Sequence, residues 1–328
     1  MEFQQLERTL GSFQQSVSAE QVQTMCRRAF GPDRQIVSAV ELDGGMYNNT
    51  YRVEFAGERP AILRVAPEPS RQSRIERELM RNEHVVQPFL APIASLMPRI
   101  LAVDFTHQVL GRDWMIQSML PGVPAPEGLE SRPRSEWGPF FAQLGAITRQ
   151  VHDVCGPRFG PITGPGFRRW SDAVLAVLQD TAADLEDAGL DAGDVREAVT
   201  ITEKNRPLLD EVTEPRLLTG DLFTINCLVR EGDGPLTITG VIDFDRATWG
   251  PPEADWTIFM ASRRTSLERD MFWTTYGPLS TDPAAVQRRL IYRVVHLGAI
   301  RLERQRTGRV DALAESYEEM SEVLASLR

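Results

Sequence analysis

Two neighbouring stretches, LLTGDLFTINCLV (217–229) and VIDFDRATWGPPEADW (241–256), decide the fold. Each contains a short apolar run typical of a β-strand, and the turn EGDG (231–234) lies between them, so together they predict a hairpin. The hairpin brings Asp221, Asn226 and Asp243 into one small volume. Such a trio suits phosphoryl transfer, in which one carboxylate takes or orients the acceptor hydroxyl while hard oxygen ligands hold Mg²⁺ on nucleotide phosphates.

The rest of the chain divides into a β-rich part and a helical part. After a helix over 18–30, opened by the capping box Ser18–Gln21, three runs (35–42, 50–55, 60–67) predict an antiparallel meander. A charged helical segment (72–84) and a second strand pair (98–105, 113–119) follow. The Pro/Gly-rich stretch 121–136 marks a boundary. Helical patterns then cover 136–153, 169–187, 193–212, 253–263, 283–305 and 310–327. The sequence predicts an α+β protein with an N-lobe (1–118) and a C-lobe (119–328).

Composition and charge exclude several classes of protein. The chain of 328 residues carries 36 basic and 46 acidic residues, a net charge of −10, without the basic stripe that nucleic-acid binders need. It lacks the run of about 20 apolar residues that a membrane span needs. Three scattered cysteines and an N-terminus without a secretory signal favour the cytoplasm. No P-loop, dinucleotide fingerprint or zinc-binding histidine pair is present. His152, in an apolar helical stretch, is interpreted as a packed structural histidine.

The hairpin resembles the signature of aminoglycoside phosphotransferases and their choline-kinase-like relatives, which have a protein-kinase-like fold. The matching residues are Gly220, Asp221, Asn226, Asp243, Gly250 and Asp255. Further upstream, GGMYNNTYRV (44–53) resembles the family's phosphate-covering turn, and WMIQSMLPG (114–122) resembles the strand and hinge that end the N-lobe. The resemblance spans about residues 36–305.

The resemblance implies a role for each matching residue. Asp221 is the expected catalytic base, and Asn226 and Asp243 are the expected Mg²⁺ ligands. The turn with Gly44, Gly45 and Asn48 is expected to cover the phosphates of ATP or GTP. The nucleotide base is expected to contact the backbone near Gln117, Ser118 and Met119. Asp255 and Gly250 are assigned to structure, with Asp255 bracing the catalytic loop, while Asp245 is either a second metal contact or a surface charge.

Two positions depart from the family pattern. Thr219 stands where the family usually has histidine, which affects loop rigidity more than chemistry. Arg64 stands where many members have lysine, and Lys204, the only lysine, lies in a polar helical segment. A guanidinium can still bridge phosphates and a carboxylate. Glu78, in the Arg77-Glu78-Leu79 segment that resembles the start of the family's partner helix, is the expected partner of Arg64, with Glu76 as second choice.

The sequence thus predicts a Mg²⁺-dependent phosphotransferase that moves the γ-phosphoryl of ATP or GTP to a hydroxyl of a small molecule. An antibiotic is the first acceptor expected. A metabolic or biosynthetic kinase acting on a sugar, a choline-like alcohol or a natural-product intermediate is the second interpretation. A pseudokinase that binds nucleotide without turnover is the third. The expected partners are the nucleotide and the acceptor, with neither nucleic acid nor membrane, and the expected state is a monomer or homodimer.

Overall fold

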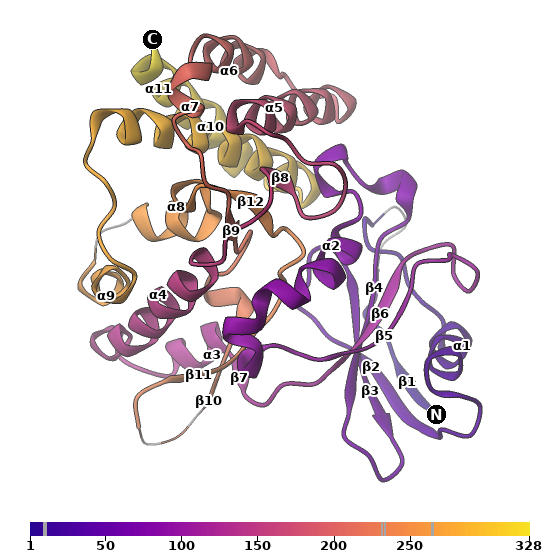
Figure 1. Cartoon of the computed structure of the whole chain (residues 1–328). Coiled ribbons are helices and arrows are strands. Elements are labelled where there is room, and N and C mark those ends of the chain that lie inside the picture. The colour runs from indigo at the N-terminus through magenta and orange to yellow at the C-terminus, as the bar shows by residue number, and fades with distance from the viewer. Residues whose placement is uncertain (9–11, 231, 233, 264–265) are drawn as a thin grey trace.

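A computed structural model describes residues 1–8, 12–230, 232, 234–263 and 266–328. Figure 1 shows two lobes, with the N-terminus on a small sheet-containing lobe and the C-terminus at the far end of a larger, mainly helical lobe. The two-lobed α+β architecture predicted from the sequence is therefore confirmed.

The N-lobe is built on one six-stranded sheet with the order β1-β2-β3-β4-β6-β5. The predicted meander is confirmed, because β3 pairs antiparallel with both β2 and β4. β1 was not predicted; it is a polar segment that pairs in parallel with β2. The strands are β1 (Glu2–Gln4), β2 (Ile36–Glu41), β3 (Asn49–Phe55), β4 (Ala61–Val65), β5 (Ile100–Asp104) and β6 (Trp114–Ser118).

Helix α1 (Ala19–Phe30) covers one face of this sheet. The predicted capping box is present, since the Ser18 hydroxyl accepts from the Gln21 amide and the Gln21 side chain accepts from the Ser18 amide. Met25 of α1 is fully buried in a core that includes Tyr51 and Leu63 from the strands. This apolar core fixes the sheet, whose strand β4 carries Arg64.

The charged segment 72–84 is not one helix, contrary to the prediction. It begins with two short 3-10 turns, η1 (Pro69–Arg71) and η2 (Arg74–Glu76), and α2 starts only at Leu79 and ends at Val86. The break falls at Glu78, which has a left-handed backbone (φ 58°) that no helix interior tolerates. After α2, η3 (Gln87–Leu96) contains prolines that prevent regular α-helical hydrogen bonding. Glu78 therefore lies before the helix rather than on it.

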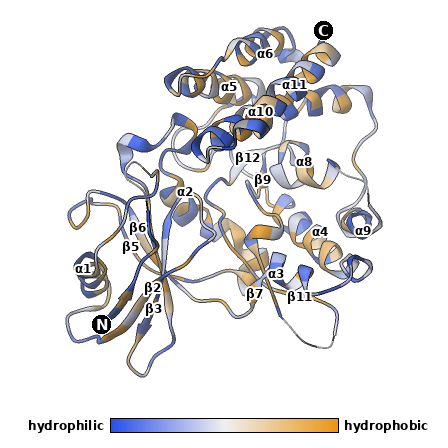
Figure 2. Cartoon of the chain, turned by 180° about the vertical axis from the view of Figure 1, so that it is seen from behind, coloured by the Kyte–Doolittle hydropathy of each residue, from blue (hydrophilic) through white to orange (hydrophobic). Residues whose placement is uncertain are grey.

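The C-lobe contains two groups of packed helices. α4 packs on α9 beside one core, and α5, α6, α10 and α11 surround the other. Figure 2 shows that these ribbons carry both hydrophilic and hydrophobic residues along their length, as amphipathic helices do. Most were predicted, but α9 and the short α3 in the Pro/Gly-rich boundary were not. The helices are α3 (Ala125–Glu130), α4 (Gly138–His152), α5 (Trp170–Asp187), α6 (Gly193–Lys204), α7 (Arg206–Leu209), α8 (Trp256–Ser262), α9 (Leu267–Tyr276), α10 (Pro283–Arg306) and α11 (Val310–Leu327), with one 3-10 turn, η4 (Arg134–Glu136), before α4.

The predicted hairpin divides into two small sheets. β10 (Cys227–Arg230) pairs antiparallel with β11 (Thr237–Val241) as expected, and β7 (Val123–Pro124) joins them. Residues 215–222, however, do not continue into β10: β9 (Arg216–Leu218) pairs with β12 (Thr248–Gly250), which also pairs with β8 (Gly160–Pro161). The chain turns away after β9 and returns through the 3-10 turn η5 (Thr224–Asn226). A second such turn, η6 (Pro252–Ala254), precedes α8. The loop between β9 and β10 carries Asp221.

β6 ends at Ser118 and β7 already pairs with the C-lobe strand β10. We therefore retain the division between residues 118 and 119 as our proposed lobe boundary. No helix in the described part of the chain is both long enough and apolar enough to cross a membrane.

Candidate active site

The loop that follows β9 is shaped by Gly220. Its φ is 82°, and a Cβ placed there would lie 2.3 Å from the carbonyl carbon of Arg246. Only glycine fits such a close approach of two backbones. The loop that carries Asp221 therefore packs closely against the segment after β11, and this segment carries Asp243.

Asp221, Asn226 and Asp243 meet at this contact between the two segments. The Asn226 side-chain amide donates to the Asp221 carbonyl at 2.8 Å, and the Asn226 carbonyl accepts from the Ile242 amide at 3.0 Å. Asp243 has a left-handed backbone (φ 67°), a strained conformation that typically persists where surrounding structure imposes it. The tertiary structure thus brings together the three residues that the sequence singled out.

The Asp221 carboxyl has a pKa close to neutral pH. Burial raises its pKa to about 7, and the neighbouring Asp243 and Glu303 carboxylates add to this, against the opposing effect of Arg246. A carboxyl with a pKa near the working pH is suited to accept a proton.

A buried hydrogen-bond network braces the loop from behind. Asp255 accepts from the Thr219 amide at 2.5 Å, from the Thr219 hydroxyl at 3.0 Å and from the Thr257 amide at 3.1 Å. His152 Nε2 lies 2.7 Å from Asp255, and since a carboxylate accepts only, this nitrogen carries the hydrogen. The bracing role expected of Asp255 is confirmed, and Thr219 joins the brace through its hydroxyl.

His152 belongs to the same network. Its ring is buried, and Nδ1 lies 2.8 Å from the Tyr276 hydroxyl. The interpretation of His152 as a packed structural histidine is confirmed. Burial would raise the pKa of Asp255, but the hydrogen bond from His152 and those from Thr219 and Thr257 hold it below its ordinary value.

Arg64 pairs with Glu83, not with the predicted Glu78. Its guanidinium contacts the Glu83 carboxylate directly and donates to Asp243 Oδ1 at 2.5 Å. The Glu78 side chain is 57% exposed and lies 3.9 Å from Arg81. The prediction was wrong because it placed the start of the helix too early. Glu76, the second choice, pairs with Arg246 and Arg306 instead.

Glu83 is the candidate site residue that the sequence did not predict. It lies on the buried face of α2 with Met80 and Val86, and its side chain is only 1% exposed. A carboxylate at i+3 on an apolar helical stripe was the available signal, because an unpaired buried charge is too costly to occur there. The Gln117 side chain also donates to Glu83, at 3.0 Å.

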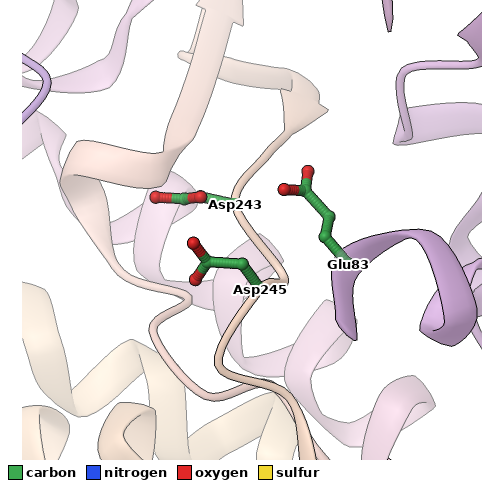
Figure 3. Close-up of side chains that lie close together, drawn as sticks. All are labelled: Glu83, Asp243 and Asp245. Carbon is green, nitrogen blue, oxygen red and sulfur yellow. The ribbon is translucent and has the colours of Figure 1, made fainter. Parts of the chain in front are cut away.

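Three carboxylates gather around the Arg64 guanidinium. Oxygens of Glu83, Asp243 and Asp245 lie within 4.8 Å of one another, with Glu83 on α2 and both aspartates on the segment after β11 (Figure 3). Asp245 is buried, so it is not a surface charge. Burial and the nearby carboxylate of Asp243 raise the pKa of Asp245, and burial raises that of Glu83 although Arg64 opposes it. This excess of negative charge, offered by hard oxygen ligands, fits a divalent cation such as Mg²⁺.

The turn between β2 and β3 holds Gly44, Gly45 and Asn48. Gly44 has φ 92°, and its amide donates to the Asp43 side chain. Asn48 is buried, and its side-chain oxygen has no hydrogen-bond partner among the described residues. The turn leads into β3 at Asn49, which pairs with Val65 of β4, so it lies at the same end of these strands as Arg64.

The end of β6 leaves one candidate contact for a nucleotide base. Gln117 is paired in the sheet on both sides, and the Ser118 amide donates to the Arg99 carbonyl at 2.8 Å. Met119 follows the last paired residue and is 40% exposed. Of the three residues expected at the hinge, Met119 is the best placed for the proposed contact.

Comparison with known proteins shows the family and the fold of this chain. The family model described as the phosphotransferase enzyme family matches residues 38–288. A search of curated proteins gives no significant match by sequence. Among solved structures, the chain is similar to a GDP complex of an aminoglycoside 2'-phosphotransferase-IIIa mutant, with a TM-score of 0.61, 19% identity and coverage of 94% of this chain and 98% of that chain.

Two further structures show the same fold. One is a ternary complex of a thermostable mutant of the aminoglycoside phosphotransferase APH(4)-Ia with AMP-PNP and hygromycin B (TM-score 0.64, 17% identity, 93% and 98% coverage). The other is an APH(2")-IIIa complex with GDP and kanamycin (TM-score 0.62, 19% identity, 93% and 98% coverage). Since the family match spans more than half of its residues, this chain belongs to the phosphotransferase enzyme family.

Proposed function

We propose that this phosphotransferase moves the γ-phosphoryl group of ATP or GTP to a hydroxyl of a small molecule, and that the acceptor is an antibiotic. The observation that carries the proposal is the meeting of Asp221, Asn226 and Asp243 opposite Arg64. In this arrangement Arg64 binds Asp243, and Asn226 binds the backbone of Asp221, so a proposed base, oxygen ligands for a cation and a fixed positive charge lie close together.

Each residue then has one task. Asp221 accepts the proton of the acceptor hydroxyl, for which a pKa of about 7 suits it. Asn226 and Asp243 would hold Mg²⁺, which when bound supplies positive charge to the nucleotide phosphates. Arg64, kept in place by Glu83, contacts the phosphates, and the turn with Gly44, Gly45 and Asn48 covers them. Placement and charge stabilisation account for most of the rate.

The acceptor is inferred from charge beside the proposed base. After burial and Asp243, the Glu303 carboxylate of α10 also raises the pKa of Asp221, so it adds negative charge to the surroundings of the proposed base. Within the described residues Glu303 forms no ion pair. A carboxylate of this kind favours an acceptor that carries amino groups. The neighbouring structures that contain kanamycin and hygromycin B support the same class.

A transfer assay tests the proposal. Purified protein is incubated with ATP or GTP, with Mg²⁺ or with EDTA, and with kanamycin, hygromycin B, a macrolide, choline or a simple sugar. Mass spectrometry should detect one added phosphoryl group on an amino-containing antibiotic, only with Mg²⁺, and not with Asp221→Asn. Phosphorylation of choline or the sugar alone would favour a metabolic kinase. Mg²⁺-dependent nucleotide binding without any transfer would favour a pseudokinase.

Glu303→Gln sharpens the inference about the acceptor. It should raise the KM of amino-containing acceptors and leave the KM of a neutral acceptor and of the nucleotide unchanged, because it removes charge without changing shape. An equal effect on charged and neutral acceptors would contradict a cationic acceptor. The cytoplasm remains the proposed location, and a monomer or homodimer the proposed state.

A further inference from the structure

Glu76 is a buried carboxylate that joins three parts of the chain. Its Oε1 accepts from Arg246 Nη2 at 2.6 Å, and its two oxygens accept from Arg306 Nη1 at 2.8 and 2.7 Å. Arg246 follows directly on Asp245, and Arg306 is the last residue of α10. The Glu76 side chain is 8% exposed. Glu76 of the N-lobe is thus bound to the segment after β11 that carries Asp243, here called the catalytic segment for its proposed role. It is also bound to the C-lobe helix α10.

The segment around Glu76 is itself fixed to the C-lobe. Asp184 of α5 accepts from the backbone amides of Arg74 and Ile75, at 2.9 and 3.1 Å, and from the Arg74 side chain. The Ser73 hydroxyl lies 3.1 Å from the Glu76 carboxylate. Glu76 therefore has a defined position without help from any ligand.

Glu76 also binds the turn that carries Gly44, Gly45 and Asn48. The Tyr47 hydroxyl donates to the Glu76 carbonyl at 2.8 Å. The Tyr47 ring lies 5.5 Å from that of Phe13, and the Arg306 guanidinium lies over both rings, 4.8 Å from Phe13 and 5.4 Å from Tyr47. Cations over aromatic faces are attractive contacts. The turn is therefore bound to the end of α10.

A second contact holds the turn from the other side. The Gln14 side-chain amide donates to the Gly45 carbonyl at 2.9 Å and to the Asn48 carbonyl at 2.8 Å. A glycine-rich turn held in this way loses little further entropy when it closes on a ligand, which is the usual benefit of preorganisation.

We propose that Glu76 and Tyr47 are positioning residues that fix the turn over the nucleotide phosphates relative to the catalytic segment. The inference rests on the proposed function, because it takes this turn to be the phosphate cover. Arg246, which the Glu76 carboxylate binds, packs its backbone closely against Gly220, the residue before the proposed base Asp221. A movement of the turn would then change nucleotide binding more than acceptor binding.

The test compares Tyr47→Phe and Glu76→Gln with a matched control, Tyr317→Phe. Tyr317 also donates its hydroxyl to a backbone carbonyl, that of Asp191 at 2.9 Å, and also lies under an arginine, Arg301, but on α11. Hydrogen exchange of the peptide 43–49 is measured without nucleotide, and KM and kcat are measured for ATP, or GTP, and for the acceptor.

Both Tyr47→Phe and Glu76→Gln should speed exchange of peptide 43–49 and raise the nucleotide KM, by about 3–10-fold for Tyr47→Phe, the loss expected for one hydrogen bond. The acceptor KM should stay within about twofold, because the proposal places the turn over the nucleotide and not over the acceptor. Tyr317→Phe should change neither quantity.

Unchanged exchange in Tyr47→Phe would overturn the proposal, and so would an equal rise in both KM values. If wild-type protein transfers no phosphate, the proposed function fails, while the exchange result still decides whether Glu76 and Tyr47 hold the turn.

Discussion

The loop that carries Asp221 and the carboxylate cluster around Arg64 are stabilised in opposite ways. Behind the loop, one buried carboxylate, Asp255, receives hydrogen bonds from Thr219, Thr257 and His152. In the cluster, three carboxylates share one guanidinium, that of Arg64. The pKa of Asp255 lies below its ordinary value, whereas those of Glu83 and Asp245 lie above theirs.

The difference distinguishes a structural brace from a binding site. A carboxylate whose hydrogen bonds outweigh the cost of burial is stable in its ionised form. A carboxylate cluster with surplus negative charge is stabilised by any further positive charge placed within it. Changes behind the loop should therefore affect stability first, while changes in the carboxylate cluster should affect nucleotide and metal binding first.

The largest effect is expected at Asp221, on the loop itself. Asp221→Asn should lower kcat by about 10²–10⁴-fold, the usual loss for a general base, and leave nucleotide affinity nearly unchanged. In the wild type kcat should rise with pH through about 7, because the carboxyl must be deprotonated to accept a proton. The measurement is a pH–rate profile of both proteins. A variant that keeps the wild-type kcat would show that Asp221 is not the base.

The same substitution has a consequence for stability. Because the folded pKa is raised, the contribution of Asp221 to stability is fully present below about 3.8 and is lost as pH rises through about 7. Asp221→Asn removes this loss, so its Tm at pH 8 should exceed that of the wild type. Equal Tm values at pH 8 would show that the carboxyl is not destabilised by its surroundings.

A loss of Mg²⁺-dependent nucleotide binding is expected from Asp243→Ala. It removes a proposed metal ligand and a partner of Arg64, so affinity at fixed Mg²⁺ should fall by at least about 10-fold. Calorimetric titration with and without EDTA measures it. Asp33→Ala, at an exposed aspartate after α1, serves as control. Unchanged affinity in Asp243→Ala would refute the assignment.

Behind the loop, Asp255→Ala should cost stability rather than nucleotide affinity. It leaves buried donors on Thr219 and Thr257 without a partner, and the free energy of unfolding should fall by about 3–5 kcal/mol. Thr219→Val, which removes only the hydroxyl, should cost about 1–3 kcal/mol. Urea unfolding at neutral pH measures both. Wild-type stability in Asp255→Ala would mean that the network is no brace.

The smallest effect concerns the partner of Arg64. A double-mutant cycle between Arg64 and Glu83 should give a coupling of about 0.5–3 kcal/mol, while the cycle between Arg64 and Glu78 should be additive. Arg64→Ala should raise the nucleotide KM and lower kcat together, and Arg64→Lys should recover part of both, because it keeps the charge but not the fork. Coupling with Glu78 instead of Glu83 would contradict the structure.

Local patterns in the sequence predicted much of the fold and three residues of the candidate site. The N-lobe strands β2 to β6 and most helices follow from hydrophobic periodicity and turn residues, which act over a few positions. Asp221, Asn226 and Asp243 could be grouped because a hairpin joins them and their spacing is short. The split of residues 215–229 into β9, a loop and β10 escaped prediction, because β9 pairs with β12, about 30 positions further along the chain.

The sequence by itself determined which chemistry can be proposed for the site: its motif supplies the proposed base, the proposed oxygen ligands for a cation and an arginine. Only the tertiary structure decided which carboxylate faces which arginine. Glu76, Glu78 and Glu83 lie within eight residues, and one left-handed residue at 78 directs Glu83 to Arg64 and leaves Glu78 exposed. Glu76 meets its arginines from positions 170 and 230 residues away. The physical reason is that an ion pair depends on distances in space, and local patterns cannot rank acidic neighbours that differ only in where the fold points them.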